Sequence, residues 1–236
     1  MKRTSAAGVS LLTVAALMSL AGCSGTATAS MPGATAPPKR QPTPVQRVTA
    51  LLVARADLGT GYSVREFDPA KGPSVFARSA QEITGDGPCI PLAAMTHQLP
   101  LGRPQAYLSR VVSTEEAPGT RIYVTLATYD QGMGTTAMDT LLEDAVQGCS
   151  LGFDVRANGH GELYYPFQPE ETPDVGDEAL AYRGVITEEG GGSRPIRTTV
   201  VRHGDAIAVY TAVGGARIAT PALLTPVIEA QDAKLR

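Results

Sequence analysis

Five segments rich in β-forming residues follow one another in the second half of this 236-residue chain, and this succession restricts the fold more than any other feature. The five segments are 152–156, 162–167, 179–187, 197–203 and 206–213. Antiparallel strands can be joined by short turns, whereas parallel strands need long crossover connections. These segments are separated by 2 to 11 residues with no predicted helix between them. A run of strands with the helices set apart predicts an α+β fold with a mainly antiparallel sheet.

Earlier segments add strands and well-separated helices. Alternation of residue types predicts three further strands, at 62–67, 106–113 and 121–129. Apolar residues at helical spacing predict helices at 45–58, 90–97 and 135–148, and one that starts at Thr220 and is interrupted at Pro226. We expect these helices to pack on the sheet.

The N-terminus has the features of an export signal. Lys2 and Arg3 precede an apolar stretch at 9–20, which at 1.5 Å per residue spans about 18 Å, less than the ~30 Å core of a bilayer. The run Leu20-Ala21-Gly22-Cys23 that follows resembles the lipobox of bacterial lipoprotein signals, whose cysteine becomes a lipid-bearing N-terminus. We therefore predict that residues 1–22 are removed and that Cys23 is lipidated. The alternative is a plain secretory signal, with Cys23 as an ordinary residue.

Lipidation would hold the protein on the outer face of the cell membrane through its acyl chains. Residues 23–44 contain mainly Ala, Thr, Ser, Gly and Pro, with too few apolar side chains to build a core, and are predicted to be a disordered linker. The remaining residues, 45–236, are long enough for one domain with a substantial core. The predicted organisation is thus a signal peptide, a tether and a single extracytoplasmic α+β domain.

The charge of the mature chain argues against some partners. Without Lys2 and Arg3, 18 basic residues remain against 23 acidic residues, a formal net charge of −5. Binding to nucleic acid, or lying flat on anionic lipid, requires a basic face. We therefore expect no nucleic-acid partner, and contact with the membrane only through the lipid anchor.

Two cysteines remain in the domain, Cys89 and Cys149. An extracytoplasmic location favours a disulfide bond between them, which would close a loop of about 60 residues and stabilise the domain by ~4 kcal/mol on the chain-entropy model. The alternative is a reactive or metal-binding thiol pair. No Cys-x-x-Cys spacing and no nearby histidine supports that alternative.

The sequence contains no Gly-x-Ser-x-Gly, Ser-x-x-Lys or His-Glu-x-x-His motif and no Walker-type glycine loop, so we expect neither enzymatic activity nor a cofactor or metal. The three histidines, His97, His160 and His203, have no metal-ligand spacing, and we expect them to be exposed. The glutamate pairs at 115–116, 170–171 and 188–189 occur in loop-like sequence and are expected to be solvated.

Aromatic residues offer the best indication of a ligand site. A groove for an apolar or sugar-like ligand is predicted from Tyr107, Tyr123, Tyr129, Tyr164, Tyr165 and Phe167. The alternative is that these side chains pack in the core and on the sheet faces.

The order of these features resembles that of a known family. The chain has, in order, a lipobox, a Pro/Thr/Ala linker, a first helix leading into residues 56–62 (ADLGTGY), a cysteine opening a short helix, and a helix ending at Cys149. This order is similar to that of the extracellular sensor domain of actinobacterial PknH-type kinases. The chain departs from that family in having one cysteine pair and no tryptophan. The resemblance implies a ligand-sensing domain with a cleft, and it transfers no catalytic residue.

Two functions are compatible with this pattern. The first is a membrane-anchored sensor-like or ligand-binding domain without catalytic activity, whose ligand is a small molecule, a glycan or a protein. The second is a carrier of lipid or glycolipid in the cell envelope. A carrier needs a large apolar cavity, so a cavity below ~300 Å³ would exclude it.

Overall fold

The computed structural model describes residues 41–236, except for residues 74–75, 86 and 215–219 and the side chains of 142–147. The predicted signal, Cys23 and most of the predicted linker lie outside the described residues. Residues Gln41–Arg236 form one compact unit that contains its own core. Among the described helices, none combines the length and the apolar character needed to cross a membrane.

The centre of the domain is a nine-stranded sheet, counted over the described residues, in which every pair of neighbours is antiparallel. The strands are β1 (Tyr62–Phe67), β2 (Thr84–Gly85), β3 (Ala106–Thr114), β4 (Arg121–Thr128), β5 (Phe153–Ala157), β6 (His160–Pro169), β7 (Glu178–Glu188), β8 (Ser193–His203) and β9 (Ala206–Val213). Their order across the sheet is β1-β3-β4-β9-β8-β7-β6-β5-β2. The predicted antiparallel α+β fold is confirmed.

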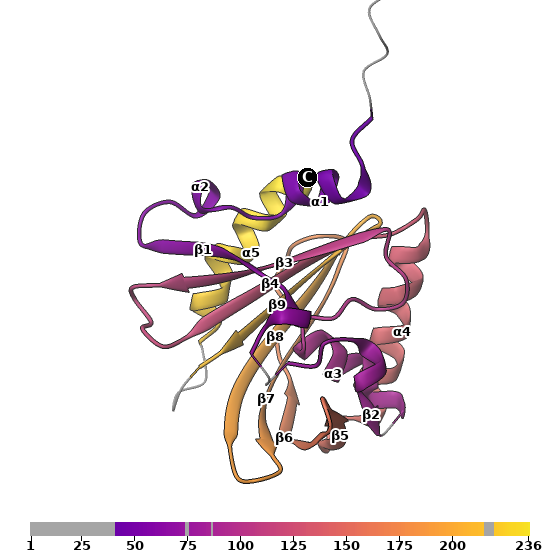
Figure 1. The fold of residues 1–236 in the computed structure, drawn as a ribbon. Coiled ribbons are helices and arrows are strands. Elements are labelled where there is room, and N and C mark those ends of the chain that lie inside the picture. The colour runs from indigo at the N-terminus through magenta and orange to yellow at the C-terminus, as the bar shows by residue number, and fades with distance from the viewer. Residues whose placement is uncertain (1–40, 74–75, 86, 215–219) are drawn as a thin grey trace, which may run out of the picture. The chain divides into compact units, whose positions relative to one another are not determined.

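Helices cover both faces of this sheet. They are α1 (Pro44–Leu51), α2 (Arg55–Leu58), α3 (Ile90–Thr96), α4 (Met133–Gly148) and α5 (Pro221–Leu235). One core cluster joins α1 and α5 to β3, β4, β8 and β9, and a second joins α3 and α4 to the opposite face of β5–β9 (Figure 1). Consequently neither α1 nor α5 covers β5 and β6, the strands that form the site described below.

Strand β9 shows why the central strands are apolar on both faces. Its residues alternate between the two clusters, with Ile207 and Val209 on the α3/α4 side and Ala208 and Tyr210 on the α1/α5 side. A strand buried on both faces has a nearly continuous apolar sequence, whatever its pairing. A tight turn at Gly204, which has a φ of 54°, joins the end of β8 to the start of β9.

The disulfide bond between Cys89 and Cys149 is present, with a Cα–Cα distance of 5.8 Å and both residues fully buried. Cys89 directly precedes α3 and Cys149 directly follows α4. The bond therefore fastens the start of one helix to the end of the other on the same face of the sheet. This predicted pairing is confirmed.

Two helix predictions require correction. The helix predicted at 45–58 is divided, because Leu52 is extended and the buried Gln231 of α5 binds the backbone on both sides of it. The Gln231 amide accepts from the Val53 N–H at 2.7 Å and donates to the Leu51 carbonyl at 2.8 Å.

The second correction concerns α5, which is one continuous helix through Pro226, without the predicted interruption. Proline removes one helical hydrogen bond, which is normally enough to break or kink a helix. Here Leu224, Val227 and Ile228 on both sides of the proline are buried in the α1/α5 core. Burial of this face keeps the segment helical across the missing bond.

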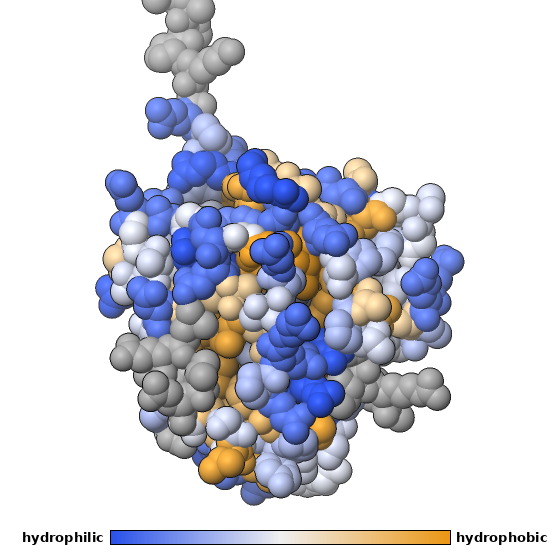
Figure 2. Space-filling view, turned by 180° about the vertical axis from the view of Figure 1, so that it is seen from behind, coloured by the Kyte–Doolittle hydropathy of each residue, from blue (hydrophilic) through white to orange (hydrophobic). Residues whose placement is uncertain are grey.

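The surface carries few large apolar side chains. Seen from behind, hydrophilic residues cover most of the domain, and hydrophobic residues form small patches between them (Figure 2). The exposed large apolar residues among those described are Val45, Tyr107, Met133, Leu151, Leu163 and Tyr165. Two of them, Leu163 and Tyr165, lie close together on β6.

Candidate functional site

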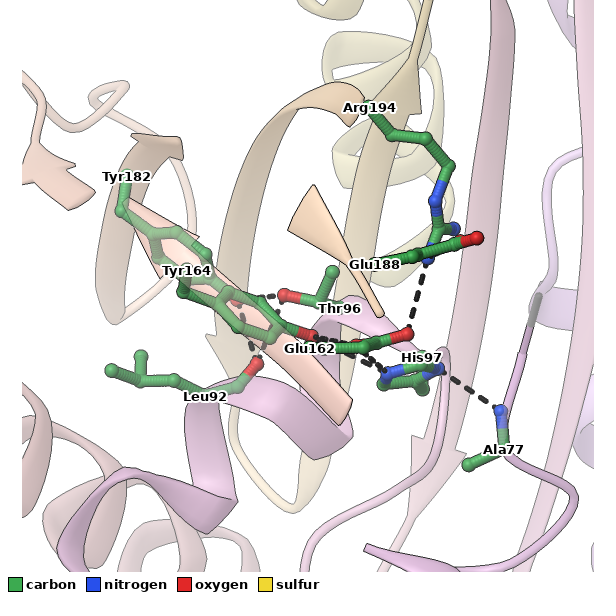
Figure 3. A network of polar contacts seen from close by, with 9 residues as sticks. All are labelled: Ala77, Leu92, Thr96, His97, Glu162, Tyr164, Tyr182, Glu188 and Arg194. Carbon is green, nitrogen blue, oxygen red and sulfur yellow. Dashed lines mark hydrogen bonds and ion pairs between the residues drawn. The ribbon is translucent and has the colours of Figure 1, made fainter. Parts of the chain in front are cut away.

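A buried network of polar side chains lies where the end of α3 meets strands β6, β7 and β8. Its members are His97, which follows α3, Glu162 and Tyr164 of β6, and Arg194 of β8 (Figure 3). Glu162 lies at the centre, between the imidazole and the guanidinium. The side chains of His97 and Glu162 are only 1% and 4% exposed, so both depend on protein partners.

The backbone fixes the orientation of the His97 ring. The Ala77 N–H donates to Nδ1 at 3.0 Å, which requires Nδ1 to be the acceptor nitrogen. The ring hydrogen is then on Nε2, which faces Glu162 Oε2 at 3.0 Å and the Tyr164 hydroxyl oxygen at 3.3 Å. His97 therefore connects the segment before α3 to strand β6.

Glu162 uses both carboxylate oxygens. The Tyr164 hydroxyl donates to Oε2 at 3.1 Å, and Arg194 Nη2 donates to Oε1 at 3.1 Å. Burial acts most strongly and would raise the pKa of Glu162, but the hydrogen bonds from His97 and Tyr164 and the charge of Arg194 together lower that pKa below its ordinary value. The carboxylate is thus held in its charged form.

Arg194 extends this network toward solvent. Its Nη2 also forms an ion pair with Glu188 Oε1 at 2.8 Å, and the Glu188 side chain is 32% exposed. The register of β6 and β7 places Glu162 directly opposite Glu188. Two carboxylates therefore share one guanidinium, one from inside the domain and one at its surface.

A second buried contact ties α3 to the sheet. The Tyr182 hydroxyl of β7 donates to the Leu92 carbonyl at 3.0 Å and lies 2.9 Å from the Thr96 hydroxyl. Burial raises the pKa of Tyr182 to about 12, so the phenol stays neutral. With the His97 contacts and the disulfide bond, α3 is fixed at its start, middle and end.

A hollow of about 530 Å³ opens beside the network and shares Glu162 and Glu188 with it. Its other lining residues are Gly85, Asp154, Val155, Arg156, Gly161, Leu163, Thr187 and Glu189. We call this the β5–β7 hollow. It combines a surface open to ligands with a buried, electrostatically perturbed carboxylate, a combination common at functional sites.

Another hollow, of about 520 Å³, lies where α1 approaches β1 and β3. We call it the α1 hollow. Val45, Thr49 and Tyr107 are among its lining residues, and Arg110, also in the lining, donates to the carbonyls of Leu52 and Val53. This hollow contains no part of the network around Glu162. It therefore serves as a structural control for the β5–β7 hollow.

The predicted aromatic residues are not brought into one groove. Tyr123, Tyr129, Tyr164 and Phe167 are at most 7% exposed. Tyr164 stacks on Phe153 with ring centroids 4.4 Å apart. These four side chains pack in the core, as the alternative interpretation expected.

Of the two remaining aromatic residues, Tyr107 is 40% exposed and lines the α1 hollow. Tyr165 is 61% exposed and follows the β5–β7 hollow along β6. The predicted site residues Tyr107 and Tyr165 therefore belong to different surface regions. Tyr165 is exposed two residues along β6 from Leu163, which lines the β5–β7 hollow, whereas the adjacent Tyr164 is buried.

The expectation of exposed histidines is wrong for two of the three. His97 is buried in the network, and the His203 side chain is 8% exposed with Nε2 3.4 Å from Asp232 Oδ1. Burial lowers the pKa of His203. His160 is exposed, as expected. The apolar sequence before His97 was a signal for its burial, but no spacing pattern links His97 to Glu162.

Two of the glutamates expected to be solvated form buried or half-buried ion pairs. Glu188 pairs with Arg194, and Glu170 binds Arg197 through contacts of 2.6 and 2.8 Å. Glu188 is the last residue of β7 and Glu170 directly follows β6, and both strands are longer than the sequence predicted. Over the part of the chain that the structure describes, no group of three or more His, Cys, Asp or Glu side chains is arranged to hold a metal ion.

No protein-family model and no curated protein sequence matches this chain. Its structure is similar to the crystal structure of the extracellular domain of PknH from Mycobacterium tuberculosis, with a TM-score of 0.53 and 10% identity over 83% of this chain and 97% of that chain. A protein of Mycobacterium smegmatis, an Rv0999 ortholog, matches with a TM-score of 0.36 and 12% identity over 77% of this chain and 95% of that chain. The chain therefore has a fold like that of the PknH extracellular domain.

Proposed function

We propose that this protein is a lipid-anchored, extracytoplasmic ligand-binding domain of the sensor type, without catalytic activity, and that its ligand occupies the β5–β7 hollow. The fold is like that of a domain described as extracellular. The Cys89–Cys149 disulfide is typical of oxidising compartments outside the cytoplasm. The signal and lipobox at Cys23 supply the anchor in this proposal.

The observation that carries the proposal is the direct connection between the hollow and α3. Glu162 lines the hollow, and its carboxylate accepts from His97 at the end of α3. A ligand that moved Glu162 or Glu188 would change the charges facing Arg194 and His97. Such a connection gives binding at the surface a route to the buried side of the sheet, which a sensor needs.

A lipid or glycolipid carrier is less well supported. Both hollows exceed the volume of ~300 Å³ below which a carrier would be excluded. However, the lining of the β5–β7 hollow includes Asp154, Arg156, Glu188 and Glu189. An acyl chain packed against these charged groups would remove their bound water without offering hydrogen bonds in its place.

The anchor is tested by the substitution Cys23→Ala. We expect the variant to lose the acyl chains, and the mature domain to be recovered without detergent, because one or more acyl chains supply the membrane affinity. The measurement is fractionation of cells followed by intact-mass analysis. Retention of a detergent-dependent membrane fraction by the variant would contradict the lipid anchor.

The ligand site is tested by placing a charge on the floor of the hollow. Leu163 is 40% exposed, so Leu163→Glu should leave the fold intact while blocking the hollow. The chain from Ser24 onward is incubated with envelope extract of the native host and examined by native mass spectrometry. We expect a bound species on the wild type that is absent from the variant.

The matched control is Val45→Glu, which places the same charge on an exposed apolar residue of the α1 hollow. Val45 lies in the first turn of α1, where a carboxylate is tolerated by the helix dipole. The control should retain the bound species. Binding that is equally retained by Leu163→Glu, or lost only in Val45→Glu, would move the site away from the β5–β7 hollow.

A further inference from the structure

The open face of β5 and β6 continues the β5–β7 hollow into a short apolar surface. Leu163 and Tyr165 alternate with the buried Glu162 and Tyr164, so both side chains lie on the face turned away from α3 and α4. At ~3.3 Å per residue they are about 7 Å apart along the strand. An ideal Cβ on Gly152 would lie 3.0 Å from the Tyr165 ring, so glycine at this position lets the ring lie close to the backbone.

Polar side chains of the neighbouring strands β5 and β7 lie directly opposite residues of β6. Asp154 of β5 and Thr187 of β7 lie opposite Leu163 on either side, and Arg156 lies opposite Gly161. Asp154 and Arg156 are exposed, since the alternate residues of β5 are buried. The result is an apolar strip that has hydrogen-bonding groups on both sides of Leu163.

The hollow has a surplus of negative charge. Four of its lining residues are carboxylates, Asp154, Glu162, Glu188 and Glu189, against the guanidiniums of Arg156, which is in the lining, and Arg194, which binds two of them. The formal charge is therefore −2. Arg156 lies 3.9 Å from Glu189, whereas Asp154 has no ion pair or hydrogen bond of its side chain with any described residue.

The geometry points to a glycan that carries free amino groups as the ligand of this hollow, an inference that rests on the proposed function. A pyranose ring has apolar C–H faces, which fit Leu163 and the Tyr165 ring, and hydroxyls at its edges, which fit Asp154, Arg156 and Thr187. An ammonium group on the sugar complements the unpaired Asp154 and is attracted to the face of the Tyr165 ring. Phosphorylated or uronic sugars would be repelled by the surplus carboxylates.

The inference is tested by calorimetric titration of the chain from Ser24 onward with the hexamer of glucosamine. We expect saturable binding that weakens about tenfold or more in Asp154→Asn and about tenfold in Tyr165→Ala. The control Tyr107→Ala removes an exposed tyrosine of the α1 hollow and should change the affinity by less than about twofold.

Two further probes separate the features of the ligand. The hexamer of N-acetylglucosamine has the same ring faces without the ammonium charge, and spermine has the charge without the rings. We expect each to bind at least about tenfold more weakly than the glucosamine hexamer. Equal binding of the acetylated hexamer, or spermine binding that is equally tight and insensitive to Tyr165→Ala, would overturn the assignment.

Failure of this inference is distinguishable from failure of the proposed function. In one outcome, the species from envelope extract binds the wild type and not Leu163→Glu, while the glucosamine hexamer does not bind at millimolar concentration. The hollow is then a site for a ligand of another chemical class, and the glycan assignment is wrong. If neither the extract species nor the hexamer binds, both proposals are wrong. Binding of both, with the extract species lost in Leu163→Glu and the hexamer bound more weakly by Asp154→Asn, supports both.

Discussion

Replacing both Cys89 and Cys149 by serine is expected to lower the free energy of unfolding by about 4 kcal/mol, since the cross-link restricts a loop of 60 residues in the unfolded chain. For a domain of this size, that loss corresponds to a decrease in Tm of roughly 8–16 °C. The bond also joins the start of α3 to the end of α4, which pack on the same side of the sheet. Thermal and urea unfolding of the chain from Ser24 onward measure it.

Reduction of the wild type supplies the control for this variant. A reductant should lower the Tm of the wild type toward that of the double-serine protein and leave the latter unchanged. It should also raise the mass of the wild type by about two daltons, one hydrogen for each freed thiol. Identical midpoints with and without reductant would show that the cross-link does not stabilise the domain.

Glu162→Gln is expected to destabilise the domain by about 3 kcal/mol, because it removes the charge at the centre of a buried network. The amide has nearly the same shape as the carboxylate, but its NH₂ group cannot accept from His97, Tyr164 or Arg194. This value lies at the lower end of the range for breaking a buried ion pair, because Arg194 retains its ion pair with Glu188. Urea unfolding at neutral pH provides the measurement.

The same substitution made at Glu189 is the control. Glu189 has a side chain that is 68% exposed, and its ion pair with Arg156 is 3.9 Å long. Exposed pairs of this kind contribute about 0–1 kcal/mol, so Glu189→Gln should change stability by no more than about 0.5 kcal/mol. Equal changes in the free energy of unfolding for Glu162→Gln and Glu189→Gln would show that burial of the network does not increase its contribution to stability.

The pH dependence gives an independent readout of Glu162. Its pKa is lower in the folded protein than the ordinary value of 4.5, so the unfolded chain takes up the proton first as pH falls. The stabilisation is therefore complete above about pH 4.5 and is lost as the pH falls through the folded-state pKa. Since glutamine does not titrate, the stability difference between wild type and Glu162→Gln should shrink between pH 7 and pH 3.

The antiparallel fold could be predicted because its determinants are local. Alternation of residue types and turn residues such as Gly204 identified β7, β8 and β9 within a few residues of their observed ends. The pairing of Cys89 with Cys149 could be predicted because the domain was expected to lie outside the cytoplasm and contains only these two cysteines. These inferences did not require knowing which residues meet across the sheet.

The candidate site could not be predicted in the same way. Its connection depends on His97 and Glu162, which are 65 residues apart, and on Arg194, a further 32 residues along the chain. No periodicity relates these positions. The division between α1 and α2 had the same cause, because the buried Gln231 contacts Leu51 from 180 residues away.

The sequence by itself determined the type and order of most elements, and it predicted the export signal and the anchor at Cys23, because periodicity, turn chemistry and short motifs act between neighbouring residues. Only the tertiary structure decided which polar side chains are buried and which lie open. Packing of α3 against β6 and β7 placed His97, Glu162 and Tyr164 inside the domain, while the face of β5 and β6 that α1 and α5 leave uncovered kept Leu163 and Tyr165 exposed. Burial makes a polar group costly unless it has a partner, so the network and the hollow beside it exist only in the folded chain.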